Sequence, residues 1–382
     1  MMNVIILNES FPPLIDGVSN VVLNYANRLY SLGHSPVVVT TRVLKAKDDY
    51  AYPVLRYQAV YLGRNLEYPV GNPYAPGIVK RILKQQPQIL HVHSPFISSV
   101  VAKRVKKKTG CPIVTTYHTK FDIEFNTRTK FEPFRRFARW LLIRNMNDSD
   151  EVWVVSTGAG ENLRGLGYEG EYVVMPNGTD FPLGRAPERA VEEIGRKHGV
   201  GPDELVFLYV GRLRWYKNIR LILDALRTVK DCGITFRFLL VGKGKDGGEI
   251  KSYAKKLGLE REVEMCGPCS DRDMLKAYYS RADLFVFPST FDTFGLVVKE
   301  AAACECPSVL VKDSCAADGV IDGRNGYLAE EDAGELAQTI LRAVEDRDRL
   351  KEVGRAAAKE LYYSWDEAIR DAVARYENLI NN

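Results

Sequence analysis

The 382 residues exceed what one hydrophobic core usually supports, so two domains are expected. A composition of 46% hydrophobic and 27% charged residues is typical of a soluble globular protein. No apolar run reaches the roughly 18 residues that span a bilayer. The seven cysteines are irregularly spaced, which argues against a disulfide framework. The net charge of +4 divides unevenly, because residues 1–150 carry 21 Lys or Arg against 10 Asp or Glu, whereas the remainder carries 32 against 39. The basic half indicates either an anionic partner or solvated helix faces.

The first half of the chain alternates apolar runs with helical patterns. A helix is expected over Val18–Tyr30, where apolar side chains fall on one stripe. The sequence enters a strand at once, with no basic leader, so a cytoplasmic protein is expected. The predicted strands are Val4–Leu7, Pro36–Thr40, Ile89–His93, Ile113–Tyr117, Val152–Val155 and Tyr172–Met175.

The second half repeats this alternation. Continuous Val, Ile and Leu runs indicate parallel strands buried on both faces, so the fold class is α/β with two doubly wound, Rossmann-like domains. The segment Asp180–Asp203 is rich in helix breakers and places the boundary, giving domains 1–183 and 184–364, with a last helix near 365–382 packing back on the first. The predicted strands are Val206–Val210, Phe236–Val241, Val263–Cys266, Leu284–Phe287 and Ser308–Val311.

The segment Pro288–Glu300 carries the clearest chemical signal. A strand ends at Pro288 and a helix is expected to begin near Gly295, whose N–H groups would face a phosphate at the carboxyl edge of the sheet. Asp292 before the helix and Glu300 on it could hold hydroxyls on either side of a diphosphate. The alternative is a helix cap at Asp292 and a surface acid at Glu300.

A second basic element, Tyr209–Asn218, follows another predicted strand. Gly211 ends that strand, and Arg212 and Lys217 flank a loop before a helix over Asn218–Lys230. Two cations at the carboxyl end of a strand suit a diphosphate leaving group, whose negative charge grows as the bond breaks. Ordinary surface charge is the alternative.

In this order, these elements resemble the large retaining glycosyltransferase family with the GT-B fold, which includes phosphatidylinositol mannosyltransferases, sucrose synthase and glucosyl-diacylglycerol synthases. Gly211–Asn218 is similar to the family's Gly-Arg-Leu-x-x-x-Lys-Asn motif, and Asp292 and Glu300 match its two acids separated by seven residues. Val174–Asp180, Val241–Lys245 and Asp322–Gly326 also fall in the family's order. The resemblance covers essentially the whole chain.

The resemblance implies a nucleotide-sugar donor, a cleft between the two domains and a role for each matching residue. Arg212 and Lys217 would bind the diphosphate, Glu300 the ribose and Asp292 the donor sugar. Backbone groups at Phe294, Gly295 and Leu296 would touch sugar and phosphate, and Gly267 would border the base. In the first domain, Gly17 would approach the phosphates and His118 would lie near the reaction centre. The implied reaction is transfer of a hexose from a UDP-linked sugar donor, with retention of anomeric configuration and without metal or other cofactor.

Four departures from the family's pattern leave the identity of the donor sugar open. The first acid is usually Glu and is Asp292 here, an acidic residue commonly stands at Tyr216, Asp318 stands near another usual Glu, and Glu305 replaces a small residue, usually Gly. Asp292 and Glu305 make a non-catalytic GT-B subunit that binds sugars or a partner an alternative to a transferase. A nucleotide-sugar epimerase on the same architecture is the other alternative.

Other motifs are set aside. Gly242–Gly247 fits G-x-G-x-x-G, but a dinucleotide site would carry it at the first strand–helix turn. Cys266-x-x-Cys269 lacks a second pair, so no zinc is predicted. The Asp-x-Asp pairs at Asp148, Asp271 and Asp346 are interpreted as caps or solvent-facing charge. His91 and His93 point to one face, and without a third ligand nearby they are interpreted as a packed pair.

The acceptor side is less defined. Basic segments at Lys103–Lys108 and Arg128–Arg144 hold much of the N-terminal charge, and in the latter Phe134, Phe137, Trp140 and Leu141 follow helical spacing beside arginines. Such a helix could lie on an anionic membrane and serve a lipid acceptor, at the inner face, or its aromatic stripe could face the core. A phosphorylated small acceptor is the other possibility. No nucleic-acid recognition motif accompanies these patches.

Overall fold

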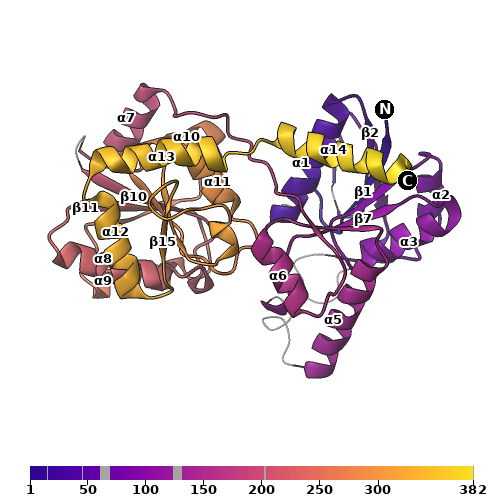
Figure 1. The fold of residues 1–382 in the computed structure, drawn as a ribbon, viewed down its shortest axis with the longest axis horizontal. Coiled ribbons are helices and arrows are strands. Elements are labelled where there is room, and N and C mark those ends of the chain that lie inside the picture. Colours follow the sequence, from indigo (N-terminus) through magenta and orange to yellow (C-terminus); the bar gives the residue numbers. More distant parts are fainter. Residues whose placement is uncertain (15, 45, 61–68, 124–130, 202–203, 382) are drawn as a thin grey trace. The chain divides into compact units, whose positions relative to one another are not determined.

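The computed structural model describes the whole chain except residues 15, 45, 61–68, 124–130, 202–203 and 382. The chain divides into two compact units: unit 1 comprises residues 1–178 and 365–382, and unit 2 comprises residues 179–364. Each is described by itself (Figure 1).

Unit 1 is built on a seven-stranded parallel sheet with the order β3-β2-β1-β6-β7-β8-β9. The strands are β1 (Asn3–Leu7), β2 (Ser35–Thr41), β3 (Val54–Tyr57), β6 (Ile89–Val92), β7 (Ile113–Tyr117), β8 (Glu151–Val154) and β9 (Val173–Val174). A separate antiparallel pair joins β4 (Ala59–Val60) to β5 (Val70–Gly71). The helices are α1 (Gly17–Ser31), α2 (Ile78–Leu83), α3 (Ile97–Thr109), α5 (Glu132–Asn147), α6 (Thr157–Gly165) and α14 (Trp365–Asn381).

Alternate residues of these strands enter two apolar layers. Ile5, Leu7, Val37 and Val39 pack in one core cluster with the buried faces of α2 and α3. On the opposite face, Tyr25 of α1 contacts Trp365 of α14 with ring centroids 5.9 Å apart. The last helix of the chain therefore completes the unit that the first strand begins.

Unit 2 holds a six-stranded parallel sheet with the order β12-β11-β10-β13-β14-β15. The strands are β10 (Leu205–Val210), β11 (Phe236–Val241), β12 (Val263–Gly267), β13 (Leu284–Val286), β14 (Ser308–Val311) and β15 (Tyr327–Ala329). The helices are α7 (Glu188–Lys197), α8 (Ile219–Asp231), α9 (Gly247–Lys256), α10 (Arg272–Arg281), α11 (Leu296–Ala303), α12 (Ala333–Val344) and α13 (Arg347–Leu361), with 3-10 turns η1 (Trp215–Lys217) and η2 (Cys315–Ala317).

The predicted fold class, α/β with two doubly wound Rossmann-like sheets, is confirmed. Some strand predictions were too long: the predicted strand Ile89–His93 ends at Val92, and the predicted strand Tyr172–Met175 is reduced to Val173–Val174. Strands β3, β4, β5 and β15, of two to four residues each, were not predicted. No helix of the described chain is long and apolar enough to cross a membrane.

Candidate active site

The strand order of unit 2 reverses between β10 and β13, which pair although β11 and β12 separate them in sequence. Doubly wound folds bind ligands beside such a reversal, at the carboxyl ends of the strands. Lys217 lies in η1, beyond β10, and Asp292 lies beyond β13. The Nζ atom of Lys217 is 2.6 Å from Oδ1 of Asp292, and the two side chains are 10% and 25% exposed. The reversal thus brings a cation and a carboxylate together.

This ion pair leaves one carboxylate oxygen available. Oδ2 of Asp292 is buried and has no hydrogen-bond partner among the described residues, and a buried acceptor without a donor is costly. The helix-cap alternative for Asp292 is wrong, because Gly295 occupies the N-cap of α11 with no side-chain cap. The Nζ atom of Lys217 also lies 5.0 Å from the ring centroid of Phe291, within the range of a cation–π contact. The site offers one hydroxyl-accepting oxygen beside a fixed cation.

Arg212 does not join this pair. Its side chain is exposed, and in the described chain its guanidinium makes no hydrogen bond or ion pair. Its backbone is held instead, because the hydroxyl of Tyr209 donates to its carbonyl oxygen over 3.1 Å. Arg212 is therefore a cation on a fixed backbone that can reach toward an anionic ligand.

Two loops beside Arg212 pack backbone to backbone. A Cβ atom on Gly242 would lie 1.8 Å from the carbonyl oxygen of Gly211, and one on Gly244 would lie 2.0 Å from that of Leu213. Only glycine permits such an approach. The G-x-G spacing is thereby explained by packing, without a dinucleotide.

The start of α11 is shaped by Gly295. Its φ of +68° favours glycine, and an added Cβ atom would lie 2.8 Å from that of Ala316. Phe294 is buried beside it, and Leu296 is the first residue of the helix. With no capping side chain and no acidic residue in its first turn, α11 presents its N–H groups to an anion.

Glu300 lies on α11 and is held by two side chains of α10. Arg272 donates to its Oε1 over 3.0 Å, and the Tyr279 hydroxyl donates to its Oε2 over 3.1 Å. Burial raises the pKa of Glu300, while Arg272 opposes the rise. With its side chain only 12% exposed, Glu300 is not the surface acid of the alternative interpretation. Gly267, the last residue of β12, has a φ of +74° and accepts a hydrogen bond from the backbone of Gly242 over 2.9 Å.

In unit 1, His118 follows β7 and meets His93, which follows β6. Nε2 of His118 lies 2.8 Å from Nδ1 of His93, and the rings stack with centroids 5.1 Å apart. Burial lowers the pKa of His118 to about 3, so both rings are neutral near pH 7 and one donates to the other. This pairing fixes the orientation of His118.

His91 extends this cluster toward the last helix. Its Nδ1 lies 2.6 Å from the Tyr376 hydroxyl of α14, and its Nε2 lies 2.7 Å from Oγ1 of Thr116. The rings of His91 and His93 are 4.0 Å apart. In the part of the chain that is described, neither histidine belongs to a group that could hold a metal ion.

Gly17 is the exposed first residue of α1. The preceding Asp16 accepts from the backbone of Ser19 over 2.6 Å, and the Ser19 hydroxyl accepts from the backbone of Asp16 over 2.8 Å, which forms a capping box. Nothing lies within 4 Å of a Cβ atom built on Gly17, so its surroundings are open. Ile15, two residues before Gly17, lies outside the described residues.

Comparisons with known proteins identify the family of the chain. The family described as "Glycosyl transferases group 1" matches residues 190–360, and "Glycosyltransferase Family 4" matches residues 15–181. The chain belongs to the group 1 GT-B glycosyltransferases. This glycosyltransferase is 24% identical over 378 residues, 94% of each chain, to the alpha-monoglucosyldiacylglycerol synthase of Acholeplasma laidlawii. It is 25% identical, over 99% of this chain and 89% of that one, to a GDP-mannose-dependent alpha-mannosyltransferase of Corynebacterium glutamicum.

Solved structures share the fold of this glycosyltransferase. Sucrose-phosphate synthase from Thermosynechococcus elongatus superposes with a TM-score of 0.82 at 21% identity, covering 100% of both chains. Anabaena HepE in complex with UDP-glucose superposes with a TM-score of 0.75 at 20% identity, covering 99% of this chain and 100% of that one.

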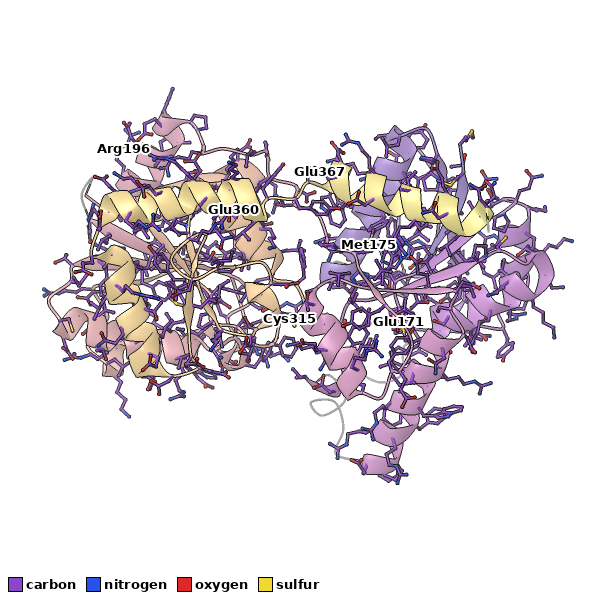
Figure 2. The ribbon with its side chains drawn as sticks, viewed as in Figure 1. Glu171, Met175, Arg196, Cys315, Glu360 and Glu367 are labelled. Carbon is purple, nitrogen blue, oxygen red and sulfur yellow. The ribbon has the colours of Figure 1, made fainter. Side chains whose placement is uncertain are left out.

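Helix α5 of the glycosyltransferase exposes large apolar side chains. Phe134, Phe137 and Trp140 are 53%, 56% and 52% exposed, so the core-facing alternative is wrong for them. The buried residues of the helix are Ala138, Leu142, Asn145 and Met146. Figure 2 shows the side chains of α5 projecting from the ribbon. Residues 128–130 of the predicted basic stretch lie outside the described residues.

Sequence analysis missed several residues of these sites. Arg272 was treated only as part of a charged Asp-x-Asp segment, and Tyr279 gave no signal, although both hold Glu300. Glu9, just beyond β1, accepts from the backbone of Ser98 over 2.7 Å, and burial raises its pKa to about 7 against the effect of Ser98. Its position after the central strand of unit 1 is the signal that could have found it.

Proposed function

We propose that this glycosyltransferase moves a hexose from a UDP-sugar held by unit 2 to an acceptor hydroxyl, with retention of anomeric configuration. The observation that carries the proposal is the Lys217–Asp292 pair at the strand reversal, with Oδ2 of Asp292 buried and unpartnered. Lys217 and Arg212 would neutralise the diphosphate, Asp292 would accept a hydroxyl of the sugar, and Glu300 would accept the ribose hydroxyls.

The reaction requires one bond to break and one to form at the anomeric carbon. The bond to the diphosphate oxygen breaks, and that oxygen gains charge that Lys217 and the N–H groups at the start of α11 would stabilise. The acceptor oxygen bonds to the same face of the sugar, and its proton passes to the departing diphosphate. His118, kept neutral by burial and oriented by His93, would orient sugar hydroxyls, and no divalent ion is needed at the diphosphate.

The choice of UDP is supported by a structural neighbour whose complex holds UDP-glucose, whereas one relative is named for GDP-mannose. The test is a thermal-shift panel of UDP-, GDP- and ADP-sugars, in which a donor at about 100 times its dissociation constant adds about 2.7 kcal/mol of stability. We expect a UDP-sugar to raise the midpoint most. A larger shift with a GDP-sugar would overturn the choice of base, and no shift with any would overturn the donor site.

Transfer itself is tested with Lys217→Met and Glu300→Gln. Loss of a fixed cation at the leaving group should lower kcat by about 100-fold or more, whereas Glu300→Gln should mainly raise KM for the donor. Lys230→Met, which removes a lysine from the end of α8, is the matched control. NMR of the product anomer tests retention. Unchanged transfer in both site variants would refute the proposal, and conversion of donor without an acceptor would indicate an epimerase.

We further propose that the acceptor is a lipid, reached by α5 lying on an anionic membrane. Exposed aromatic side chains beside Arg136 and Arg139 combine burial in the interface with attraction to anionic headgroups, each cation contributing about 1 kcal/mol. One relative is named as a diacylglycerol glycolipid synthase. Its name supports a lipid acceptor and does not identify one.

Vesicle sedimentation tests this membrane contact. We expect binding to vesicles of phosphatidylglycerol and phosphatidylcholine, weaker binding to phosphatidylcholine alone, and loss of binding in Phe137→Glu/Trp140→Glu. Tyr30→Glu, which changes an aromatic residue of α1 that is 49% exposed, is the matched control. Equal binding by the α5 variant and the control would refute the membrane role of α5, without affecting the donor site.

A further inference from the structure

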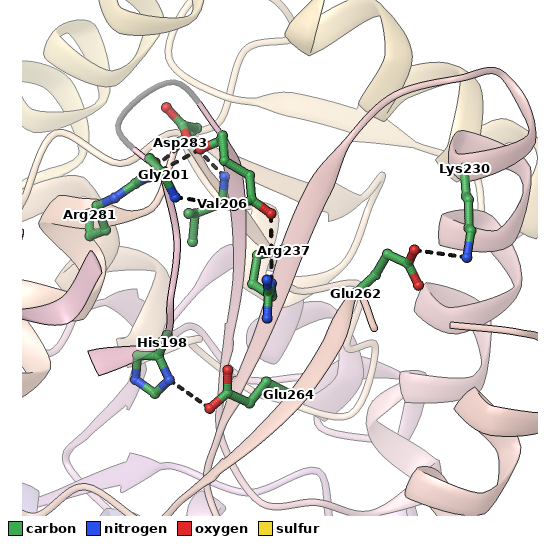
Figure 3. A network of polar contacts seen from close by, with 10 residues as sticks. His198, Gly201, Val206, Lys230, Arg237, Glu262, Glu264, Arg281 and Asp283 are labelled. Atoms are coloured by element: carbon green, nitrogen blue, oxygen red, sulfur yellow. Dashed lines mark hydrogen bonds and ion pairs between the residues drawn. The ribbon is translucent and has the colours of Figure 1, made fainter. Parts of the chain in front are cut away.

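Three side chains that are candidate metal ligands meet in unit 2, away from the Lys217–Asp292 pair. His198 follows α7 directly, and Glu264 and Cys266 lie on the edge strand β12. Nδ1 of His198 is 2.7 Å from Oε1 of Glu264, as Figure 3 shows. The ligand atoms of all three residues lie within 4.8 Å of one another, and among the described residues this is the one such group.

The donor set has a definite chemical preference. Imidazole nitrogen, carboxylate oxygen and thiolate sulfur together suit Zn²⁺, which binds them at about 2.0–2.3 Å in tetrahedral geometry. A carboxylate and a thiolate also balance the two positive charges of the ion. The 2.7 Å contact between His198 and Glu264 would open by less than about 1 Å to admit a metal between the two atoms.

The surroundings supply the outer contacts that metal-binding histidines use. The second nitrogen of His198, Nε2, lies 2.7 Å from the Tyr278 hydroxyl of α10, which fixes the ring with Nδ1 toward β12. Lys197 donates to the same hydroxyl over 3.2 Å. The side chain of His198 is only 3% exposed, so its orientation is set by these contacts.

The thiol is protonated when no metal is bound. Burial, and then the charge of Glu264, raise the pKa of Cys266 to about 12. A bound cation would displace that proton, because the thiolate is the ligand form. Cys269 stands three residues further on, just beyond the end of β12, and is half-buried.

We propose that His198, Glu264 and Cys266 form a Zn²⁺ site, with the fourth position filled by Cys269 or by water. The ion joins the end of α7 to β12, the strand that ends at Gly267. It is a structural site, because its ligands lie beside α10, at the end of α7 and on the edge strand β12, rather than at the strand reversal. The sequence could not show it: Cys266 and Cys269 look like a half-site, and His198 precedes Glu264 by 66 positions.

The experiment uses the full chain without a histidine tag. Protein is equilibrated with Zn²⁺ or Co²⁺, dialysed, and measured for bound metal and for the thiolate-to-cobalt absorption band. We expect one equivalent of either ion, a visible tetrahedral cobalt spectrum, and a higher unfolding temperature with Zn²⁺. Cys266→Ser and His198→Gln should each lower metal affinity by at least tenfold. Cys266→Ser should remove the thiolate band if water is the fourth ligand, and should weaken it if Cys269 is.

Cys232→Ser is the matched control, because Cys232 is an exposed free cysteine at the end of α8 and should bind metal as the parent does. Cys269→Ser decides the fourth ligand: a weaker thiolate band assigns it to Cys269, and an unchanged band assigns it to water. Circular dichroism of the apo variants checks folding independently. The proposal is overturned if the parent retains no metal, or if Cys266→Ser and His198→Gln retain it as well as Cys232→Ser does.

Discussion

Replacing Glu305 by glycine should stabilise unit 2. Glu305 follows α11 with a φ of +60°, in the left-handed region that non-glycine residues rarely occupy. The helix ends there in a Schellman arrangement, since the N–H of Cys306 bonds to the carbonyl of Ala301 over 3.0 Å and that of Glu305 to Ala302 over 3.0 Å. The side chain of Glu305 makes no hydrogen bond or ion pair with any described residue, so the strained backbone has no evident compensation.

The gain can be worked from two terms. Left-handed backbone costs a non-glycine residue about 1–2 kcal/mol. The greater conformational entropy of glycine in the unfolded chain lowers the free energy of unfolding by about 0.4–1 kcal/mol. The net expectation is about 0.5–1 kcal/mol in favour of Glu305→Gly, or a rise of about 1–4 °C in the unfolding midpoint of a unit of this size.

Calorimetry of the parent, Glu305→Gly and Glu305→Ala measures this effect. Glu305→Ala removes the same carboxylate but keeps a Cβ atom, so it should give none of the gain. If alanine stabilises as much as glycine, removal of charge rather than relief of backbone strain is responsible, and the reasoning fails.

Three further outcomes are expected. Gly354→Ala should destabilise unit 2 by about 1–3 kcal/mol in urea titrations, because its Cβ atom would lie 2.1 Å from a backbone carbonyl oxygen; a neutral effect would contradict the packing. Tyr376→Phe should cost about 1–3 kcal/mol by leaving Nδ1 of the buried His91 without its partner, with unchanged urea midpoints as the contrary result. The folded pKa of His118, about 3, lies below its unfolded value of 6.5, so its contribution to stability is present above pH 6.5 and is lost at about 1.4 kcal/mol per unit as pH falls toward 3. His118→Gln should remove the share of His118, so the parent should lose stability more steeply than the variant as pH falls. His91 and His93, whose pKa values burial also lowers, act in the same direction in both proteins, and the raised pKa of Glu9 acts in the opposite direction.

The sequence was informative about the fold because both sheets are parallel and fully covered. Strands such as β10 and β11 are buried along almost their whole length and appear as unbroken apolar runs. Short strands escape this signal, since β15 has three residues and follows the turn at Gly326. For the site, Lys217 and Asp292 could be expected to meet because each follows a strand beside the reversal.

Side-chain contacts between helices could not be predicted from the sequence in the same way. The hold of Arg272 and Tyr279 on Glu300 depends on how α10 packs beside α11, and the pairing of His91 with Tyr376 joins residues 285 positions apart. The exposure of Trp140 likewise depends on which side of α5 the sheet covers, since aromatic residues at helical spacing are equally compatible with a core.

The return of α14 to unit 1 has a consequence for synthesis on the ribosome. The first 178 residues emerge with the face around His91 uncovered, and all of unit 2 must be translated before Trp365 and Tyr376 follow. Domains generally fold as units during synthesis, N-terminal first. Here unit 1 cannot complete its fold until α14 has been translated, and until then its uncovered apolar face is accessible to chaperones. Unit 2 is therefore the first unit whose whole sequence is available for folding.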